Sequence, residues 1–209
     1  MPDKIYNILF LCTGNSTRSI LAESIMRKDG AGRFCSFSAG SQPKGEVNPF
    51  ALKVLKAANY PVDGLRSKSW LEFAALDAPA LDFVFTVCDN AAGETCPVWP
   101  GQPTTAHWGI EDPAAVQGTD LEKEAAFVAA LRYLRNRISI FMNLPLRLID
   151  SLSLGTKPRE IGKLEAALRT RRPADGQLRS LTAPGRRSAW DGNPGRYCRG
   201  LRHHGRNAD

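Results

Sequence analysis

The residues best suited to chemistry form one short run near the N-terminus, Cys12-Thr13-Gly14-Asn15-Ser16-Thr17-Arg18-Ser19. The run follows an apolar stretch and precedes a segment with helical spacing. Its backbone N–H groups therefore lie at a helix N-terminus, where they can bind an anion. Arg18 offers a planar fork of donors to two oxygens of such an anion. We expect this positive field to lower the pKa of Cys12 and make it a thiolate nucleophile. The run therefore predicts a loop that binds a tetrahedral oxyanion and attacks it.

A simpler interpretation of the same residues is a buried cysteine at the end of a core strand, followed by a surface arginine on a helix. The residues between them favour the anion-binding loop, because Gly14 and Asn15 both tolerate positive φ values. Phosphate and arsenate are too alike for the loop to separate them, so the reaction has to be inferred from residues elsewhere in the chain.

A carboxylate and a second thiol fall where they could reach this loop. Ligands of parallel α/β sheets bind at the carboxyl ends of the strands, and Cys12, Cys88 and Asp112 each follow a predicted strand. Asp112 precedes a proline, which holds it in an extended conformation suited to a general acid over the loop. A plain Asp-Pro turn is the alternative interpretation of Asp112.

Cys88 and Cys96 are joined by a glycine-containing segment, and together they predict a thiol relay. One thiol would attack a covalent intermediate on Cys12, and the other would resolve the resulting disulfide. The alternatives are that Cys88 is a small buried hydrophobe and that Cys96 has no role. Of the other cysteines, Cys35 is expected in the core and Cys198 is expected to take no part.

The elements that must position these residues alternate between strands and helices. Apolar runs and helical spacing predict strands over 6–11, 34–39, 82–87 and 104–108, helices over 19–28, 49–59, 67–75 and 120–143, and a loop over 89–103. This alternation predicts an α/β domain with a parallel sheet. Thr119 and Glu122 form a capping-box pattern at the start of the last helix. The residues of that helix expected to face the core are Leu121, Val128, Leu131 and Ile138.

The net charge of +7 is concentrated near the C-terminus. Residues 1–150 carry 15 Lys and Arg against 16 Asp and Glu, whereas residues 151–209 carry 13 against 5. We predict a catalytic domain over 1–150, an extra helix over 151–168 and a basic, disordered tail over 169–209. Nucleic-acid binding by the tail is the alternative, and it is disfavoured because clustered basic residues with interleaved aromatic residues are scarce there.

The chain has neither a stretch of 18 apolar residues nor a signal-peptide pattern at its start. We therefore expect a cytoplasmic protein without a membrane partner. In that reducing compartment its 5 cysteines are expected to be free thiols or catalytic groups rather than a disulfide framework. His107 has no cysteine or histidine at metal-ligand spacing, so no zinc site is expected.

Taken together, these residues resemble the low-molecular-weight protein tyrosine phosphatase superfamily, and within it the arsenate reductases of that fold. The resemblance covers about residues 5–150. The segments that carry it are Leu9 to Ser16, Phe37 to Ser41, Gly64 to Trp70, Thr86 to Asp89, Cys96-Pro97, and His107-Trp108-Gly109 through Asp112-Pro113. The implied fold is a three-layer sandwich with a four-stranded parallel sheet.

The resemblance also implies a role for each site residue. Cys12 would attack arsenate, and Asp112 would protonate the departing oxygen. Cys88 would then attack Cys12 and release arsenite, and Cys96 would take over the disulfide and present it to thioredoxin or a glutathione/glutaredoxin system. Ser19 would hydrogen-bond the thiolate. The residues implied to hold the oxyanion, with phosphate and sulfate as analogues, are Thr13, Gly14, Asn15, Ser16, Thr17, Arg18 and Ser19, with Asn15 also bracing the loop. No tightly bound cofactor is implied.

Two departures from the family pattern bear on the relay. Thr17 stands where the superfamily often has a second cysteine, which closes one internal disulfide route. The separation of Cys88 and Cys96 is slightly longer than in the thioredoxin-coupled pattern, which leaves the reductant open.

The function predicted is reduction of arsenate to arsenite for arsenic detoxification. The alternative is hydrolysis of phosphomonoesters through a cysteinyl-phosphate intermediate, although no pair of tyrosines follows Asp112-Pro113 to accept a tyrosine ring. A regulator that binds oxyanions or nucleic acid without turnover is a third interpretation. The intact set of Cys12, Arg18 and Asp112 argues against it.

Overall fold

The computed structural model describes residues 4–93, 97, 99 and 102–145, and the structural statements below concern these residues. The predicted helix over 151–168 and the predicted tail over 169–209 lie outside them. Those two predictions, and the boundary of the catalytic domain at residue 150, therefore stay predictions.

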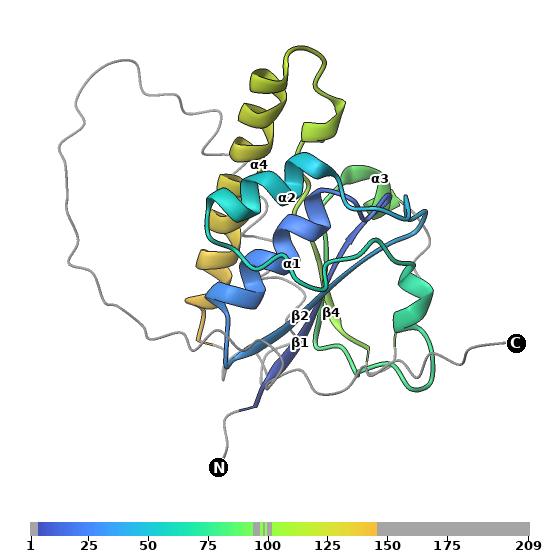
Figure 1. Ribbon diagram of the computed structural model, residues 1–209. Helices are drawn as coiled ribbons and strands as arrows, with labels where there is room; N and C mark the ends of the chain where they lie inside the picture. The colour runs from blue at the N-terminus through green and yellow to red at the C-terminus, as the bar shows by residue number, and fades with distance from the viewer. Residues whose placement is uncertain (1–3, 94–96, 98, 100–101, 146–209) are drawn as a thin grey trace, which may run out of the picture.

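Four parallel strands form the centre of the fold. They lie in the order β2-β1-β3-β4, with bounds Tyr6–Cys12 for β1, Phe34–Gly40 for β2, Phe83–Thr86 for β3 and Thr104–His107 for β4 (Figure 1). The chain places β2 on one side of β1 and β3 on the other, so its direction across the sheet reverses between β1 and β3. Ligands of such sheets bind outside the carboxyl ends of the strands at this switch point. Cys12 ends β1 and Cys88 follows β3, so both thiols lie there.

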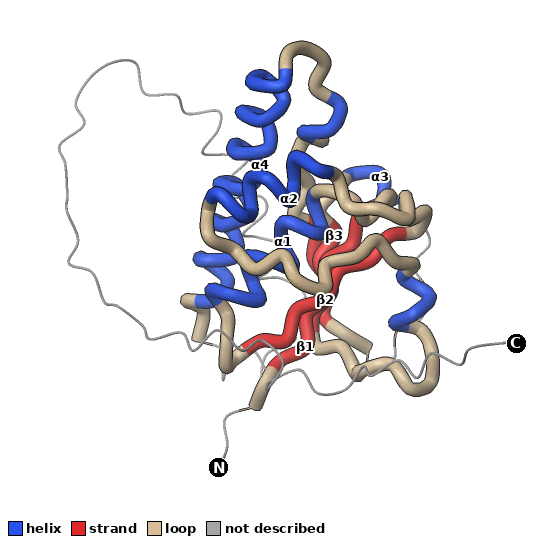
Figure 2. The backbone as a smooth tube through the Cα atoms, viewed as in Figure 1, coloured by secondary structure: helices blue, strands red, loops and turns tan. Residues whose placement is uncertain are grey.

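Helices cover one face of the sheet. They are α1 (Arg18–Asp29), α2 (Pro49–Ala57) and α4 (Asp120–Met142), and they lie on the same side of the strands (Figure 2). Residues 8–11 of β1 have no exposed surface, as expected for a parallel strand covered on both faces. The core beneath the helices contains an aromatic group in which the rings of Phe85 and Trp108 stack with centroids 4.0 Å apart.

The opposite face is covered by a short 3-10 helix, η1 (Trp70–Phe73), and by loop segments. Leu9, Leu11 and Val84 of the sheet pack there against Phe73 and Trp99. The predicted α/β class with a four-stranded parallel sheet is confirmed. The layer on this face is thinner than the layer of helices on the other face. The segment expected to form a helix over 67–75 is this 3-10 helix.

Capping residues expected from the sequence mark the starts of α2 and α4. Asn48 caps α2 by accepting a hydrogen bond from the Phe50 amide at 2.9 Å, and Pro49 occupies the first helical position. At the start of α4 the Thr119 hydroxyl accepts from the Glu122 amide, while the Glu122 carboxylate accepts from the Thr119 amide at 2.8 Å. The predicted capping box is therefore confirmed.

Two expectations about local structure are wrong. Residues 89–103 are not all loop, because Asp89–Gly93 forms a one-turn helix, α3, that is too short to show a periodic apolar pattern. In α4, Leu131 and Ile138 are buried as expected, but Leu121 and Val128 are 77% and 42% exposed. The buried stripe of α4 runs through Phe127, Leu134 and Phe141 instead.

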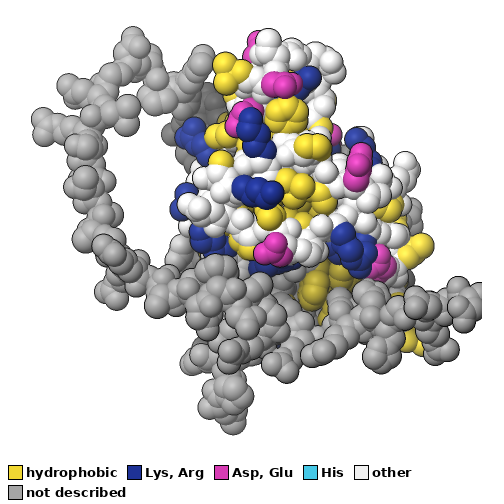
Figure 3. All heavy atoms as spheres, viewed as in Figure 1, with side chains coloured by type: hydrophobic (Ala, Val, Ile, Leu, Met, Phe, Trp, Pro, Cys, Tyr) yellow, Lys and Arg dark blue, Asp and Glu magenta, His cyan; other side chains and the backbone are white. Residues whose placement is uncertain are grey.

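The surface of the described domain is mixed in charge. On the face shown in Figure 3, basic and acidic side chains are interspersed over the helices and do not form a patch of one sign. This matches the near balance of charge in residues 1–150. Of the described helices, none has the length and apolar character needed to cross a membrane.

Candidate active site

The loop after β1 turns sharply before α1 begins at Arg18. Asn15 takes the left-handed conformation, with φ 39°. Gly14 does not, so only one of the two residues expected to tolerate a positive φ has one. Gly14 instead lies under a long side chain, since a Cβ there would be 3.3 Å from methylene carbons of Lys44. A side chain at position 14 would therefore require the Lys44 side chain to shift by a few tenths of an ångström.

The loop is also held from the side by the segment after β2. The amides of Gln42, Lys44 and Asn48 donate to the carbonyl oxygens of residues 13, 14 and 16 at 2.9, 3.0 and 2.9 Å. Gly40 permits this approach, because a Cβ at that position would be 2.4 Å from the Thr13 carbonyl oxygen. These carbonyls point away from the inside of the loop, which leaves its N–H groups for an anion.

Asn15 connects the loop to its surroundings through both ends of its amide. Its Nδ2 donates to Ser19 Oγ at 2.8 Å and to Ser38 Oγ at 2.9 Å, and its Oδ1 accepts from the Lys68 amide at 2.8 Å. The side chain is completely buried. This is the position expected of a residue that braces the loop.

Cys12 lies at the base of the loop and is 3% exposed. Its Sγ is 3.0 Å from Ser19 Oγ and accepts from the Asn15 amide at 3.2 Å. Burial raises the pKa of the Cys12 thiol, and nearby Cys88 adds to this, while the hydrogen bonds from Ser19 and Asn15 lower it. The expectation of a lowered pKa is therefore wrong for the loop in this arrangement, because loss of water outweighs the donors that face the sulfur.

Arg18 and Asp112 are paired with each other. The guanidinium donates to Asp112 Oδ2 at 3.0 Å and to the Ile110 carbonyl at 3.1 Å. Asp112 is extended, with φ −80° and ψ 108°, and its Oδ1 accepts from the Ala114 amide at 3.1 Å at the start of η2 (Pro113–Ala115). The predicted oxyanion ligand and the predicted general acid thus meet at the mouth of the loop, and the cation is directed at the carboxylate.

Cys88 lies beside the loop, as the topology predicts. It is 1% exposed, its Sγ is 3.7 Å from Thr13 Oγ1, and it accepts from the Ala91 amide at 3.4 Å. Both Cys12 and Cys88 are free thiols. Cys35 is buried in β2, in agreement with its predicted place in the core. Cys96 lies outside the described residues, so its place in the site stays a prediction.

The remaining loop residues are enclosed. Ser16 and Thr17 are buried, and the Thr17 hydroxyl has no hydrogen-bond partner among the described atoms. In the part of the chain that the structure describes, no group of three or more His, Cys, Asp or Glu side chains could hold a metal ion.

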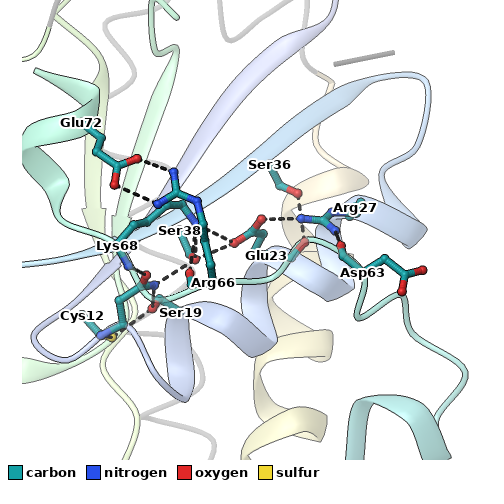
Figure 4. Close-up of polar contacts among 11 residues, drawn as sticks. Cys12, Ser19, Glu23, Arg27, Ser36, Ser38, Asp63, Arg66, Lys68 and Glu72 are labelled. Carbon is teal, nitrogen blue, oxygen red and sulfur yellow. Dashed lines mark hydrogen bonds and ion pairs between the residues drawn. The ribbon is translucent and has the colours of Figure 1, made fainter. Parts of the chain in front are cut away.

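A buried charged network behind the loop was not anticipated from the sequence. Glu23 of α1 and Lys68 are 4% and 8% exposed, and the Lys68 ammonium is 3.5 Å from a carboxylate oxygen of Glu23 and from Ser38 Oγ. Ser38 also donates to Glu23 at 2.5 Å, and Arg27 pairs with the other carboxylate oxygen at 2.5 Å. Figure 4 shows these side chains with Ser19 and Cys12, and the hydrogen bonds of Asn15 to Ser38 and Ser19 connect the network to Cys12.

This network supports the residue that braces the loop, because Ser38 and the backbone of Lys68 both contact Asn15. Burial lowers the pKa of Lys68, and the carboxylate of Glu23 opposes that shift. A buried charge is tolerated only when it is paired and hydrogen-bonded. No local sequence signal marks either residue, since burial of a lysine and a glutamate depends on contacts between β2, α1 and the segment before η1.

Comparison with known proteins shows which proteins this chain is similar to. Residues 7–143 match the model of the family described as low molecular weight phosphotyrosine protein phosphatase. The chain is 37% identical over 137 residues to an arsenate reductase of Halalkalibacterium halodurans, covering 64% of this chain and 93% of that protein. It is 36% identical over 144 residues to an arsenate reductase of Bacillus subtilis, covering 68% and 96%.

Solved structures share the fold. An arsenate reductase in the phosphate binding state superposes with a TM-score of 0.54 at 25% identity, over 66% of this chain and 97% of that one. The tyrosine phosphatase Wzb of Escherichia coli K30 in complex with sulphate also gives 0.54, at 19% identity over 66% and 97% of the two chains, which shows the fold alone. Since the family model extends from β1 through the loop that follows it to the end of α4, the chain belongs to the low molecular weight phosphotyrosine protein phosphatase family.

Proposed function

We propose that the protein reduces arsenate to arsenite, with Cys12 as nucleophile and Cys88 as the first resolving thiol. The observation that carries this proposal is the presence of two buried free thiols at neighbouring strand ends beside one oxyanion loop. Hydrolysis of a phosphomonoester needs only the first thiol. Relatives named arsenate reductase support the same choice of substrate.

The first step forms a bond between Cys12 and arsenic. The loop amides and Arg18 hold the oxyanion. The Cys12 thiol gives its proton to an oxygen of the bound oxyanion, the resulting thiolate attacks arsenic, and an As–O bond breaks. Arg18 must turn from Asp112 to the oxyanion for this, which removes the cation beside the carboxylate. Asp112, as the carboxylic acid, delivers a proton to the departing oxygen.

The second step is the reduction. Cys88 as thiolate attacks Cys12 Sγ, an S–S bond forms and the S–As bond breaks with its electron pair remaining on arsenic. Arsenic gains two electrons and leaves as arsenite, and the two thiols lose two electrons as the Cys12–Cys88 disulfide. The oxygen displaced in the first step leaves as water, and the two thiol protons end on oxygen atoms of that water and of arsenite. Arsenate and two thiols thus become arsenite, water and one disulfide, so atoms and charge balance.

The third step restores the enzyme. Cys96 attacks Cys88, Cys12 leaves as the free thiol, and the Cys88–Cys96 disulfide is reduced by an external thiol system, either thioredoxin or glutathione with glutaredoxin. No tightly bound cofactor is required. Phosphate and sulfate, which share the tetrahedral shape of arsenate, are expected to compete for the loop.

Phosphomonoester hydrolysis is the second candidate, since Cys12, Arg18 and Asp112 suffice for it. The residues after Pro113 are Ala114 and Ala115, so this position provides no aromatic ring for a phosphotyrosine. We therefore expect weak hydrolysis of small aryl phosphates beside arsenate reduction.

The test is arsenate turnover with each reductant system for the wild type, Cys88→Ser and Cys96→Ser, with p-nitrophenyl phosphate hydrolysis measured in parallel. Cys198→Ser is the matched control, since that cysteine is expected to take no part. Both relay variants should lose multiple turnover and keep hydrolysis. Full arsenate turnover in both, or efficient hydrolysis with no arsenate reduction by the wild type, would contradict the proposal.

A further inference from the structure

A histidine at the end of β4 spans the turn that carries Cys88. His107 Nδ1 lies 2.8 Å from Thr86 Oγ1, and its Nε2 lies 2.8 Å from Asp89 Oδ1. Thr86 is the last residue of β3 and Asp89 is the first residue of α3. One imidazole ring therefore connects the residues on either side of Val87 and Cys88. The proposed reaction assigns no role to this ring.

The neighbouring residues are built around the same bridge. A Cβ at Gly109 would lie 2.2 Å from Asp89 Oδ1 and 2.5 Å from His107 Nε2, so only glycine lets the pair lie across the backbone there. Trp108 is fully buried, and its amide donates to the Thr86 carbonyl at 2.7 Å. In this segment His107 thus forms the bridge, Trp108 anchors the backbone in the core, and Gly109 leaves space for the bridge.

The bridge matters because α3 cannot hold Cys88 by itself. The helix has 5 residues, and isolated helices of that length are unstable in water. The Cys88 thiol depends on its first turn, since Sγ accepts from the Ala91 amide at 3.4 Å and lies 3.7 Å from Thr13 Oγ1. Attack on Cys12 requires Cys88 Sγ to be held in line with the bond that breaks.

We propose that His107 is a positioning residue, which acts through Asp89 and Thr86 to hold Cys88 for its attack on Cys12. If Nε2 carries the ring proton, Nε2–H donates to the Asp89 carboxylate and Nδ1 accepts from the Thr86 hydroxyl, so both contacts are satisfied. His107 does not touch the oxyanion loop through any contact described above. This inference rests on the proposed reduction, because it concerns the step that distinguishes reduction from hydrolysis.

The variants His107→Ala and Asp89→Ala remove the bridge from either end, and Asp89→Asn keeps an acceptor at Oδ1. The side chains of His107 and Asp89 are 41% and 85% exposed, so their pairing adds little to overall stability and the variants should fold. Thr105→Ala is the matched control, since Thr105 is an exposed residue of β4 on the same side of the strand.

The decisive measurement is the rate at which the Cys12–Cys88 disulfide forms in a single turnover with arsenate and no reductant. All variants are compared in a Cys96→Ser background, so that the relay stops at this disulfide. We expect both alanine variants to slow it by about tenfold, since misplacing a reacting group by a fraction of an ångström has effects of this order. Asp89→Asn and Thr105→Ala should stay within about twofold of wild type. Hydrolysis of p-nitrophenyl phosphate, which uses Cys12, Arg18 and Asp112 but not Cys88, should be unchanged in all four.

A second arm uses diamide, a thiol oxidant that forms an adduct on one cysteine and is displaced by the other as the disulfide closes. It separates failure of this inference from failure of the proposed function. If the wild type does not reduce arsenate but diamide closure is slowed in both alanine variants, the positioning role stands and the substrate assignment fails. Closure at the wild-type rate in both variants, or an equal fall in phosphate ester hydrolysis, would overturn the inference.

Discussion

Replacing Lys68 by methionine tests the buried network behind the loop. Lys68→Met keeps most of the side-chain length and apolar contact but removes the ammonium. Glu23 then loses one of its two cations, while Arg27 at 2.5 Å and the Ser38 hydroxyl at 2.5 Å remain. The backbone amide of Lys68 still donates to Asn15, so the brace of the loop loses support from one side only.

The magnitude follows from these distances. Removing one partner of a buried ion pair costs about 3–5 kcal/mol when the other charge is left alone. Here the ammonium is 3.5 Å from the carboxylate, and Glu23 keeps two other partners. We therefore expect Lys68→Met to lower the free energy of unfolding by about 1–3 kcal/mol. The double variant Glu23→Gln, Lys68→Met also leaves Arg27 without the carboxylate that it pairs with at 2.5 Å, so it should be less stable than Lys68→Met.

The pH dependence has a definite sign. Burial lowers the pKa of Lys68 below its ordinary value of 10.5, so the unfolded chain binds this proton more tightly than the folded protein. Stability rises with pH wherever the unfolded state binds more protons. The stability of the wild type relative to Lys68→Met should therefore increase as the pH rises from the folded pKa towards 10.5.

The assay is urea unfolding of the wild type, Lys68→Met and the double variant at neutral pH and near the ordinary lysine pKa. Lys53→Met, which removes an exposed lysine paired with Glu124, is the control and should change stability by less than about 1 kcal/mol. A Lys68→Met protein as stable as the wild type, or a double variant more stable than Lys68→Met, would contradict the expected role of this network.

Three further predictions concern single residues in or beside the loop. Ser19→Ala should raise the pKa of Cys12, because the Ser19 hydroxyl lowers it, and the pH midpoint for alkylation of Cys12 by iodoacetamide should move upward; an unchanged midpoint would contradict this. Gly40→Ala should lower the free energy of unfolding by about 1–3 kcal/mol and reduce arsenate turnover, since its Cβ would be 2.4 Å from the Thr13 carbonyl oxygen. Unfolding and kinetics equal to those of the wild type would contradict this, because the loop would then have moved without loss. Thr17→Val should raise the free energy of unfolding by up to about 1 kcal/mol, because the buried hydroxyl has no partner among the described atoms, and a clear loss in thermal unfolding would show that this hydroxyl is bonded.

The parts of the fold that could be predicted are those encoded locally. The continuous apolar run before Cys12 predicts a buried parallel strand, and the Asn48-Pro49 and Thr119 signals predict two helix starts. The short helix α3 could not be predicted, because 5 residues contain no periodic pattern. In α4 the exposure of Val128 depends on which part of the helix surface meets the sheet, and Phe127 rather than Val128 occupies that face.

For the site, topology could predict which residues lie near one another, but not how their side chains pair or how buried they are. Cys12 and Cys88 could be placed together from topology alone, because both follow neighbouring parallel strands. The pairing of Arg18 with Asp112, the raised pKa of Cys12 and the burial of Lys68 beside Glu23 depend on side-chain orientation and solvent exclusion across elements distant in the chain. Spacing along a sequence carries no information about these.

The central claim is that Cys12 and Cys88 together reduce arsenate. It is tested most directly in the Cys96→Ser protein, where the relay should stop after the first disulfide. One equivalent of arsenite per protein molecule should be released without any reductant, with a Cys12–Cys88 disulfide identified by peptide mass spectrometry. No arsenite, or arsenite released with Cys88 still a free thiol, would contradict the claim.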